Sequence, residues 1–222
     1  MSSQPKARSA KATVFTGLPC NYMIREVPDP KGLVLLLHGW LQSGSYIFSK
    51  FEPLIPPEFT VLAMNALFPI PGRGEGHSRM GYSWYFYDSK KDEYSVGREP
   101  ALTYLMGLIQ QLGLEEVPKT LIGYSQGGYL APFVAQRLPA VKQVIGVACE
   151  YLVEELEGEL PFRVDAIHGA EDDVVSPALA QASFEKLQSR GVKGKFHLVE
   201  GVQHKITAPL QEKLQLVLAG LV

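Results

Sequence analysis

The stretch that decides the fold is LIGYSQGGYL, residues 121–130, an apolar run that ends in a glycine-rich turn and then becomes apolar again. The turn follows the pattern Gly-x-Ser-x-Gly, with Ser125 at its centre. Placed between a strand and a helix, this pattern is typical of a sharp turn that exposes a reactive serine, and the small residues let the backbone approach itself closely. By itself, the same pattern can also be an ordinary turn.

The neighbouring sequence favours a strand before the turn and a helix after it. Unbroken apolar runs of strand length recur along the chain, as expected for strands covered on both faces, at 32–37, 59–64, 119–122, 143–148 and 162–167. Helical spacing follows Ser125, recurs at 177–187 and again near the end of the chain, and is clearest at Leu102, Leu105, Met106, Ile109 and Leu112. The alternation predicts an α/β fold with a mostly parallel, doubly wound sheet and helices on both faces.

Three segments depart from this alternation. Residues 12–26 alternate apolar and polar side chains and predict a hairpin at a sheet edge. Residues 68–94 are rich in Gly, Pro and aromatic side chains and predict a long loop, and 150–159 predict an acidic surface turn. The gaps between the other elements are short, so no large cap domain is expected.

The bulk composition predicts one domain over residues 1–222, with residues 1–10 flexible. A net charge of −2 gives no general attraction to nucleic acid, and no segment is long and apolar enough for stable membrane insertion. Cys20 and Cys149 lie far apart, which predicts buried thiols in a cytoplasmic protein and neither a disulfide framework nor a metal site. No cofactor is expected, and oligomeric state is left open.

A reactive serine needs a base to accept its proton and an acid to orient that base, and this fold places both later in the chain. His204 follows a short apolar run at 196–199 and is the preferred base. His38 and His168 each precede a glycine, where an imidazole commonly bonds local backbone; His197 is expected to be structural, and His77 to contact substrate or solvent. Glu171, Asp172 and Asp173 share one turn, so the residues alone leave the acid open.

Stabilisation of a developing oxyanion requires backbone N–H groups near the serine. The amide of Gln126 opens the predicted helix, and the loop after 32–37 offers the amide of Trp40, which Gly39 lets bend toward the site. Tyr82, Trp84, Tyr85 and Phe86 could line an acyl-binding groove or cover a small satellite core.

The motifs LLLHGW, GYSQGG, HGAEDDVV and EGVQHK, taken together and in this order, resemble the phospholipase/carboxylesterase family of α/β-hydrolases, which includes acyl-protein thioesterases. The resemblance implies an α/β-hydrolase fold, and it implies Asp172 as the acid beside Ser125 and His204, with Trp40 and Gln126 as the oxyanion amides. The segments 40–44 and 81–87 are also similar to those of FSH-type serine hydrolases.

The activity that follows is cleavage of short- to medium-chain acyl esters or thioesters, on a small-molecule or acylated substrate, through an acyl-enzyme. Two kinds of alternative remain at this stage. The same three residues could serve a peptidase, lactonase, perhydrolase or acyltransferase, or the fold could be retained in a catalytically silent binding protein.

Overall fold

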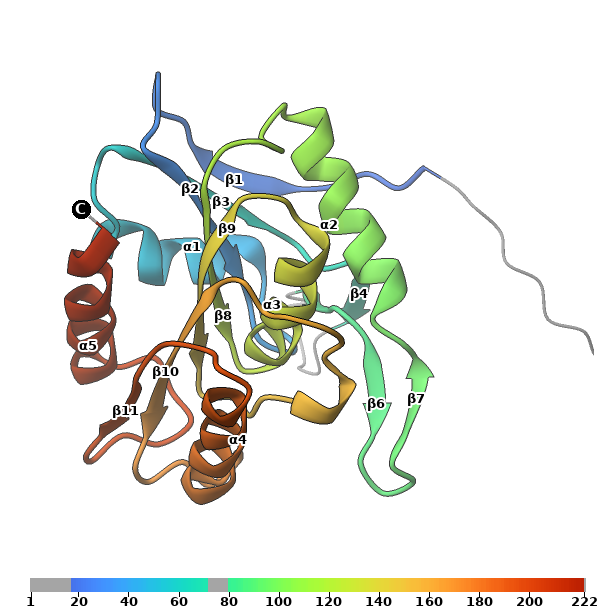
Figure 1. Cartoon of the computed structure of the whole chain (residues 1–222). Helices are drawn as coiled ribbons and strands as arrows, with labels where there is room; N and C mark the ends of the chain where they lie inside the picture. Colours follow the sequence, from blue (N-terminus) through green and yellow to red (C-terminus); the bar gives the residue numbers. More distant parts are fainter. Residues whose placement is uncertain (1–16, 72–79, 222) are drawn as a thin grey trace, which may run out of the picture.

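The computed structural model describes residues 17–71 and 80–221, with a parallel sheet at its centre (Figure 1). Its strands lie in the order β1-β3-β2-β8-β9-β10-β11. Their bounds are β1 (Tyr22–Arg25), β2 (Gly32–Leu37), β3 (Phe59–Met64), β8 (Lys119–Tyr124), β9 (Val141–Val147), β10 (Arg163–Gly169) and β11 (Phe196–Val199). β1 runs antiparallel to β3, and every other neighbouring pair in this sheet is parallel.

Helices cover both faces of the sheet. The bounds are α1 (Gly44–Phe51), α2 (Glu99–Gln111), α3 (Gln126–Arg137), α4 (Pro177–Ser189) and α5 (Ala208–Leu218), with short 3-10 turns at Glu52–Leu54, Val153–Glu155 and Ala219–Leu221. α2, α3 and α4 pack on one face, and α1 and α5 on the other (Figure 1). The predicted α/β-hydrolase architecture is confirmed.

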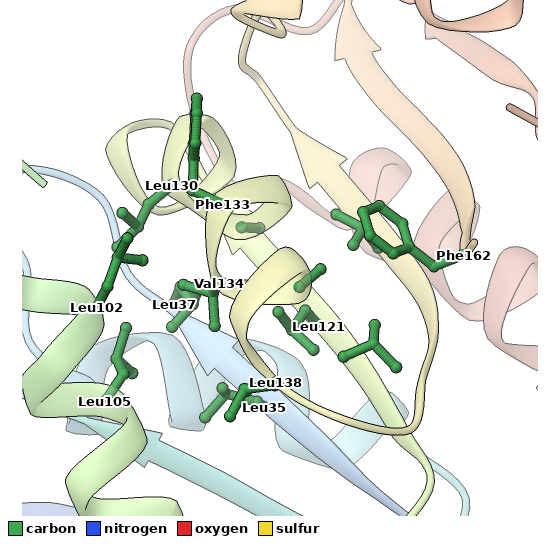
Figure 2. Packing of buried hydrophobic residues seen from close by; sticks show 14 of the residues in the cluster. Leu35, Leu37, Leu102, Leu105, Leu121, Leu130, Phe133, Val134, Leu138 and Phe162 are labelled. Carbon is green, nitrogen blue, oxygen red and sulfur yellow. The ribbon is translucent and has the colours of Figure 1, made fainter. Parts of the chain in front are cut away.

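The two faces of β2 show why an unbroken apolar run forms a central strand. Leu33, Leu35 and Leu37 point to the face covered by α2, α3 and α4, whereas Val34 and Leu36 point to the face covered by α1 and α5. All five side chains are fully buried, and each contributes on the order of 1.5–3 kcal/mol of transfer free energy. Figure 2 shows labelled leucines of β2 and β8 packed among side chains of α2 and α3.

The order of the strands also creates the crevice where a site can form. β2 lies between β3 and β8; the chain leaves β2 for α1 on one face and leaves β8 for α3 on the other. Ligands of open α/β sheets bind outside the carboxyl ends of the strands at such a switch point. The loop after β2 and the turn after β8 meet at this point.

Three expectations about local structure need correction. The hairpin predicted within 12–26 is wrong for the described residues: they form one strand, β1, which pairs with β3 at the sheet edge, and residues 12–16 lie outside the described residues. Local alternation of side chains cannot show that its partner lies about 40 residues away. Met106 is 39% exposed, because it lies at the margin of the buried α2 stripe. Cys149 is buried as expected, but Cys20 is only half-buried near the sheet edge.

The segment predicted as a long loop contains short strands. β4 (Phe68–Pro71) pairs with β5 (Met80–Ser83), and β6 (Phe86–Asp88) pairs with β7 (Glu93–Val96) in a hairpin that extends from the body at the lower right of Figure 1. The Gly-rich part that includes His77 lies outside the described residues. The acidic stretch 150–159 holds the 3-10 turn at Val153–Glu155, and Glu154 and Glu155 are exposed. In the described parts of the chain, no helix is both long enough and apolar enough to cross a membrane.

Candidate active site

Ser125 occupies a sharp turn between β8 and α3. Its backbone angles are φ 50° and ψ −120°, in a region that non-glycine residues rarely adopt and that costs on the order of 1–3 kcal/mol. The Ser125 amide donates to the Val147 carbonyl at 2.8 Å, which ties the turn to the end of β9. The surrounding fold therefore holds the serine in a strained conformation at the mouth of the crevice.

The glycines of the motif are required by close backbone contacts. A Cβ on Gly123 would lie 2.2 Å from the Gly127 carbonyl oxygen, and one on Gly127 would lie 2.3 Å from the Leu37 carbonyl oxygen. A Cβ on Gly128 would lie 2.5 Å from Cys149 Sγ. Only residues without a side chain allow α3 to approach both β2 and β8 this closely, so the sequence pattern has a structural reason.

A chain of hydrogen bonds runs from Ser125 to a buried carboxylate. His204 Nε2 lies 3.0 Å from Ser125 Oγ, and His204 Nδ1 lies 2.8 Å from Asp172 Oδ2. Since a carboxylate can only accept, Nδ1 carries the proton, which leaves Nε2 free to accept the proton of the serine hydroxyl. The structure thus brings together the three predicted residues from the ends of β8, β10 and β11.

The carboxylate of Asp172 is fixed by its own turn. Its Oδ1 accepts from the amides of Val174 at 3.0 Å and Val175 at 2.8 Å, and the side chain has no solvent exposure. Glu171 and Asp173, the other two candidates for the acid, are exposed. Of the three carboxylates in this turn, only Asp172 is both buried and bonded to His204.

Tyr124 supports the imidazole from the side. Its hydroxyl donates to the His204 carbonyl at 3.1 Å, and the two ring centroids are 5.5 Å apart at an interplanar angle of 37°. Burial raises the pKa of the Tyr124 hydroxyl, so it stays a neutral donor near neutral pH. No role for Tyr124 was predicted from the sequence, although its place next to Ser125 could have suggested one.

His38 and His168 bond nearby backbone, as predicted. His38 Nε2 accepts from the Ala66 amide at 3.0 Å, so its Nδ1 carries the proton and donates to the Gly39 carbonyl at 2.7 Å. Burial lowers the pKa of His38 to about 4. His168 Nε2 lies 3.0 Å from the Val175 carbonyl, and burial lowers its pKa as well. Both rings hold loops at the carboxyl edge of the sheet.

The loop after β2 passes directly beside the serine. A Cβ on Gly39 would lie 3.3 Å from Ser125 Cβ, and the Gly39 amide donates to Gln42 Oε1 at 2.9 Å. The loop is also paired with β5, because the Leu41 amide donates to the Tyr82 carbonyl at 3.0 Å. Among the described residues, the amides of Trp40 and Gln126 have no backbone acceptor. Both are therefore available as donors, while the Trp40 side chain is 57% exposed.

The aromatic segment divides into a buried part and a more accessible part. Trp84 is fully buried and its indole N–H donates to the His38 carbonyl at 2.8 Å; Tyr85 is 7% exposed. These two side chains pack beneath the site, so the expectation that they line a groove is wrong for the described structure. Tyr82 and Phe86 are half-buried and remain accessible. Trp84 and Tyr85 belong to the main core on the face covered by α2, α3 and α4, so the satellite-core alternative is also wrong for these two residues.

The side chain of Gln126 has a role that the sequence did not reveal. Its Nε2 donates to the Tyr85 carbonyl at 2.9 Å and to Ser83 Oγ at 3.0 Å, and its Oε1 accepts from the Trp84 amide at 3.1 Å. The residue that follows the serine therefore fastens the aromatic segment to the turn. No sequence signal could have shown this, since the contact joins positions about 40 residues apart.

The cavity nearest the loop after β2 has both polar and apolar groups in its lining. It has a volume of about 510 Å³ and is lined by Ser43, Ser45, Tyr46, Asn65, Met80 and Tyr82. Among the described residues, no group of three or more His, Cys, Asp and Glu side chains is placed to hold a metal ion. What this edge of the sheet offers chemically is thus a serine, an imidazole, a carboxylate and backbone donors.

Comparison with known proteins identifies the family. The chain matches the sequence model of the phospholipase/carboxylesterase family over residues 20–219. It belongs to this family. An acyl-protein thioesterase 1 homolog 1 from Dictyostelium discoideum is 24% identical over 218 residues, which cover 86% of this chain and 91% of that protein. Membership of the phospholipase/carboxylesterase family confirms the prediction of a hydrolase of the carboxylesterase type.

Solved structures of similar proteins share the fold. The esterase PE8 has a TM-score of 0.73 at 24% identity, covering 92% of this chain and all of that chain. The acyl-protein thioesterase 2 of Zea mays has a TM-score of 0.71 at 16% identity, covering 90% of this chain and 98% of that one. At these identities the likeness establishes the α/β-hydrolase architecture of this member of the phospholipase/carboxylesterase family.

Proposed function

We propose that the protein hydrolyses carboxylic esters or thioesters with Ser125 as nucleophile, His204 as general base and acid, and Asp172 as the group that orients the imidazole. The observation that carries the proposal is the continuous chain of hydrogen bonds, 3.0 Å from Ser125 Oγ to His204 Nε2 and 2.8 Å from His204 Nδ1 to Asp172 Oδ2. The strained backbone of Ser125, which is only partly buried, supports it.

In the first half of the reaction, Ser125 Oγ attacks the acyl carbonyl while His204 Nε2 takes its proton. The carbonyl oxygen becomes an oxyanion, to which the amides of Trp40 and Gln126 donate. His204 then returns the proton to the leaving alcohol or thiol, and an acyl-enzyme forms. In the second half, His204 activates a water that releases the acid and restores the serine. Throughout, the buried Asp172 carboxylate stabilises the imidazolium.

We propose that the substrates are esters or thioesters of short- to medium-chain acyl groups. Tyr82 and Phe86, the accessible members of the aromatic segment, would contact the acyl chain, with Trp84 and Tyr85 beneath them as fixed support. The thioesterases among the similar proteins favour including thioesters. Both cysteines are free, which suits a reducing compartment, and we propose the cytoplasm as the location.

A hydrolysis screen tests the proposal. The purified protein would be assayed with acetyl, butyryl and octanoyl p-nitrophenyl esters and with the matching thioesters, beside a Ser125→Ala control. We expect turnover with at least one acyl length and its loss in Ser125→Ala. No turnover by the folded protein would favour a silent binding protein, and faster cleavage of amides or lactones would favour the other chemistries of the same three residues. Equal rates for all three acyl lengths would remove the support for an apolar groove.

A further inference from the structure

A second pocket lies at the end of the sheet opposite Ser125. Its volume is about 450 Å³, within the range of small-molecule sites, and it is formed by the first residues of β10 and β11 and the last turns of α5. Ser125 follows the carboxyl end of β8, whereas Arg163 is the first residue of β10 and Lys195 directly precedes β11. The catalytic mechanism proposed above uses no group of this pocket.

The pocket gathers positive charge. Arg163, Lys195 and Lys213 line it, and Asp165 is the one carboxylate among the lining residues. Within residues 17–71 and 80–221, neither Lys195 nor Lys213 forms an ion pair. Three cations and one carboxylate leave a local excess of two positive charges, in a protein whose net charge is −2.

Asp165 is fully occupied in holding the pocket together. It is completely buried; Oδ2 accepts from Gln143 Nε2 at 2.6 Å and from Arg163 Nε at 2.5 Å. Its Oδ1 accepts from Arg163 Nη2 at 2.7 Å and from the Lys195 amide at 2.9 Å. This carboxylate therefore fixes one edge of the Arg163 guanidinium and the backbone of Lys195, and its oxygens have no free capacity to bind either lysine ammonium.

The three cations act on the same imidazole. Burial lowers the pKa of His197; Asp165 opposes this effect, while the charges of Lys213, Lys195 and Arg163 lower the pKa further. A neutral imidazole in the lining of a cationic pocket can donate one hydrogen bond to an anion. The charges thus converge on one place and are not scattered over the surface.

One wall of the pocket is apolar. Lys213, Leu216 and Val217 are spaced at i, i+3 and i+4 and share the face of α5 that lines the pocket. Leu216 is 69% exposed, an unusual exposure for a leucine that borders a hollow. A ligand that combines an anionic group with an apolar or planar part would contact both the lysines and this wall.

We propose that this pocket binds the phosphoryl group of a small molecule. Lys195 and Lys213 supply point charges, Arg163 supplies the guanidinium donors that Asp165 does not use, and His197 adds a neutral donor. The phosphoryl group can belong to a soluble phosphate ester or to a lipid headgroup, and the two sources are separated by the experiment below.

The first arm of the test uses pyrophosphate with the full-length protein. Binding would be followed by thermal shift and calorimetry at constant ionic strength, with NaCl replacing the ligand in the control. We expect saturable binding that weakens at least tenfold in the double variant Lys195→Gln/Lys213→Gln. The matched control Lys90→Gln/Lys91→Gln removes the same charge from the turn between β6 and β7, on the far side of the molecule in Figure 1, and should bind as the wild type does.

The second arm uses sedimentation with phosphatidylcholine vesicles that contain or lack phosphatidic acid. If binding to vesicles depends on phosphatidic acid and on the two lysines, and its affinity exceeds that for pyrophosphate, the site is assigned to a lipid headgroup. If pyrophosphate alone binds, the site is assigned to a soluble molecule. Failure of both ligands to bind, or equal losses in the two double variants, overturns the proposal. Ser125→Ala should bind as the wild type does, so the result is independent of the catalytic proposal.

Discussion

Replacing Asp172 by asparagine should abolish most of the esterase activity while leaving the fold intact. The structure fixes how the new side chain must sit. The amides of Val174 and Val175 both donate to Oδ1 of Asp172, so the asparagine keeps its carbonyl oxygen there and turns its NH₂ toward His204. A donor facing Nδ1 forces the ring proton onto Nε2.

The displaced proton disables the base. Nε2, which lies 3.0 Å from Ser125 Oγ, becomes a donor and can no longer accept the serine proton. Loss of the correct tautomer in serine hydrolases costs roughly 10⁴ in rate, or about 5.5 kcal/mol of transition-state stabilisation. Because both backbone bonds to Oδ1 survive, the free energy of unfolding should fall by only about 1–2 kcal/mol.

The quantities to measure for each variant are kcat/KM with the best p-nitrophenyl ester and the free energy of unfolding in urea. Asp173→Asn is the matched control: it makes the same chemical change one residue away, at an exposed position, and should retain most activity. Asp172 does not orient His204 if Asp172→Asn keeps more than about a tenth of the wild-type rate, or if Asp173→Asn is the more damaging of the two.

Three further predictions concern stability, each measured by urea unfolding. Gln126→Leu removes the side-chain bonds that fasten the aromatic segment and should cost about 1–3 kcal/mol; an unchanged midpoint would show that those bonds contribute nothing. Gly127→Ala places a Cβ 2.3 Å from the Leu37 carbonyl oxygen and should lower the free energy of unfolding by about 2 kcal/mol or more. Gly107→Ala, in a helix with open space around it, should raise that free energy by about 0.5–1 kcal/mol. Equal effects of the two substitutions would contradict the close contact at Gly127. His38 is neutral in the folded protein, where its pKa is about 4 and lies below the value in the unfolded chain. Its contribution to the free energy of unfolding is therefore fully present above pH 6.5, and roughly 3 kcal/mol of that free energy is lost as the pH falls to 4. Equal urea midpoints at pH 7 and pH 5 would oppose this.

The sequence predicted the features that depend on local patterns. Unbroken apolar runs identified the parallel strands because both faces of such strands are buried. Gly-x-Ser-x-Gly identified the turn because a Cβ on Gly123 or Gly127 would lie only 2.2 Å or 2.3 Å from a backbone carbonyl oxygen. The order of the chain placed Ser125, His204 and the acidic turn 171–173 at the same edge of the sheet, and the family resemblance selected Asp172 within that turn. In that sense the candidate site follows from topology.

The features that the sequence missed depend on contacts between distant segments. From the sequence, Trp84 was expected to line an acyl-binding groove or to cover a small satellite core. It is instead fully buried, because the Gln126 side chain and the His38 carbonyl form hydrogen bonds with the segment around it. The strands within 68–94 are three or four residues long, too short for a periodic pattern to stand out. The pocket of Arg163, Lys195 and Lys213 is lined by residues from β9, β10, β11 and α5, and no single stretch of sequence contains it.

The most direct test of the catalytic account is the site at which a fluorophosphonate reacts. Intact-mass and peptide analysis of the labelled protein should show one adduct, on Ser125, that disappears in folded Ser125→Ala. Because attack requires a serine activated by His204, labelling should also fall sharply in His204→Ala. Folded wild-type protein that does not react, or an adduct that persists in Ser125→Ala, would contradict the account.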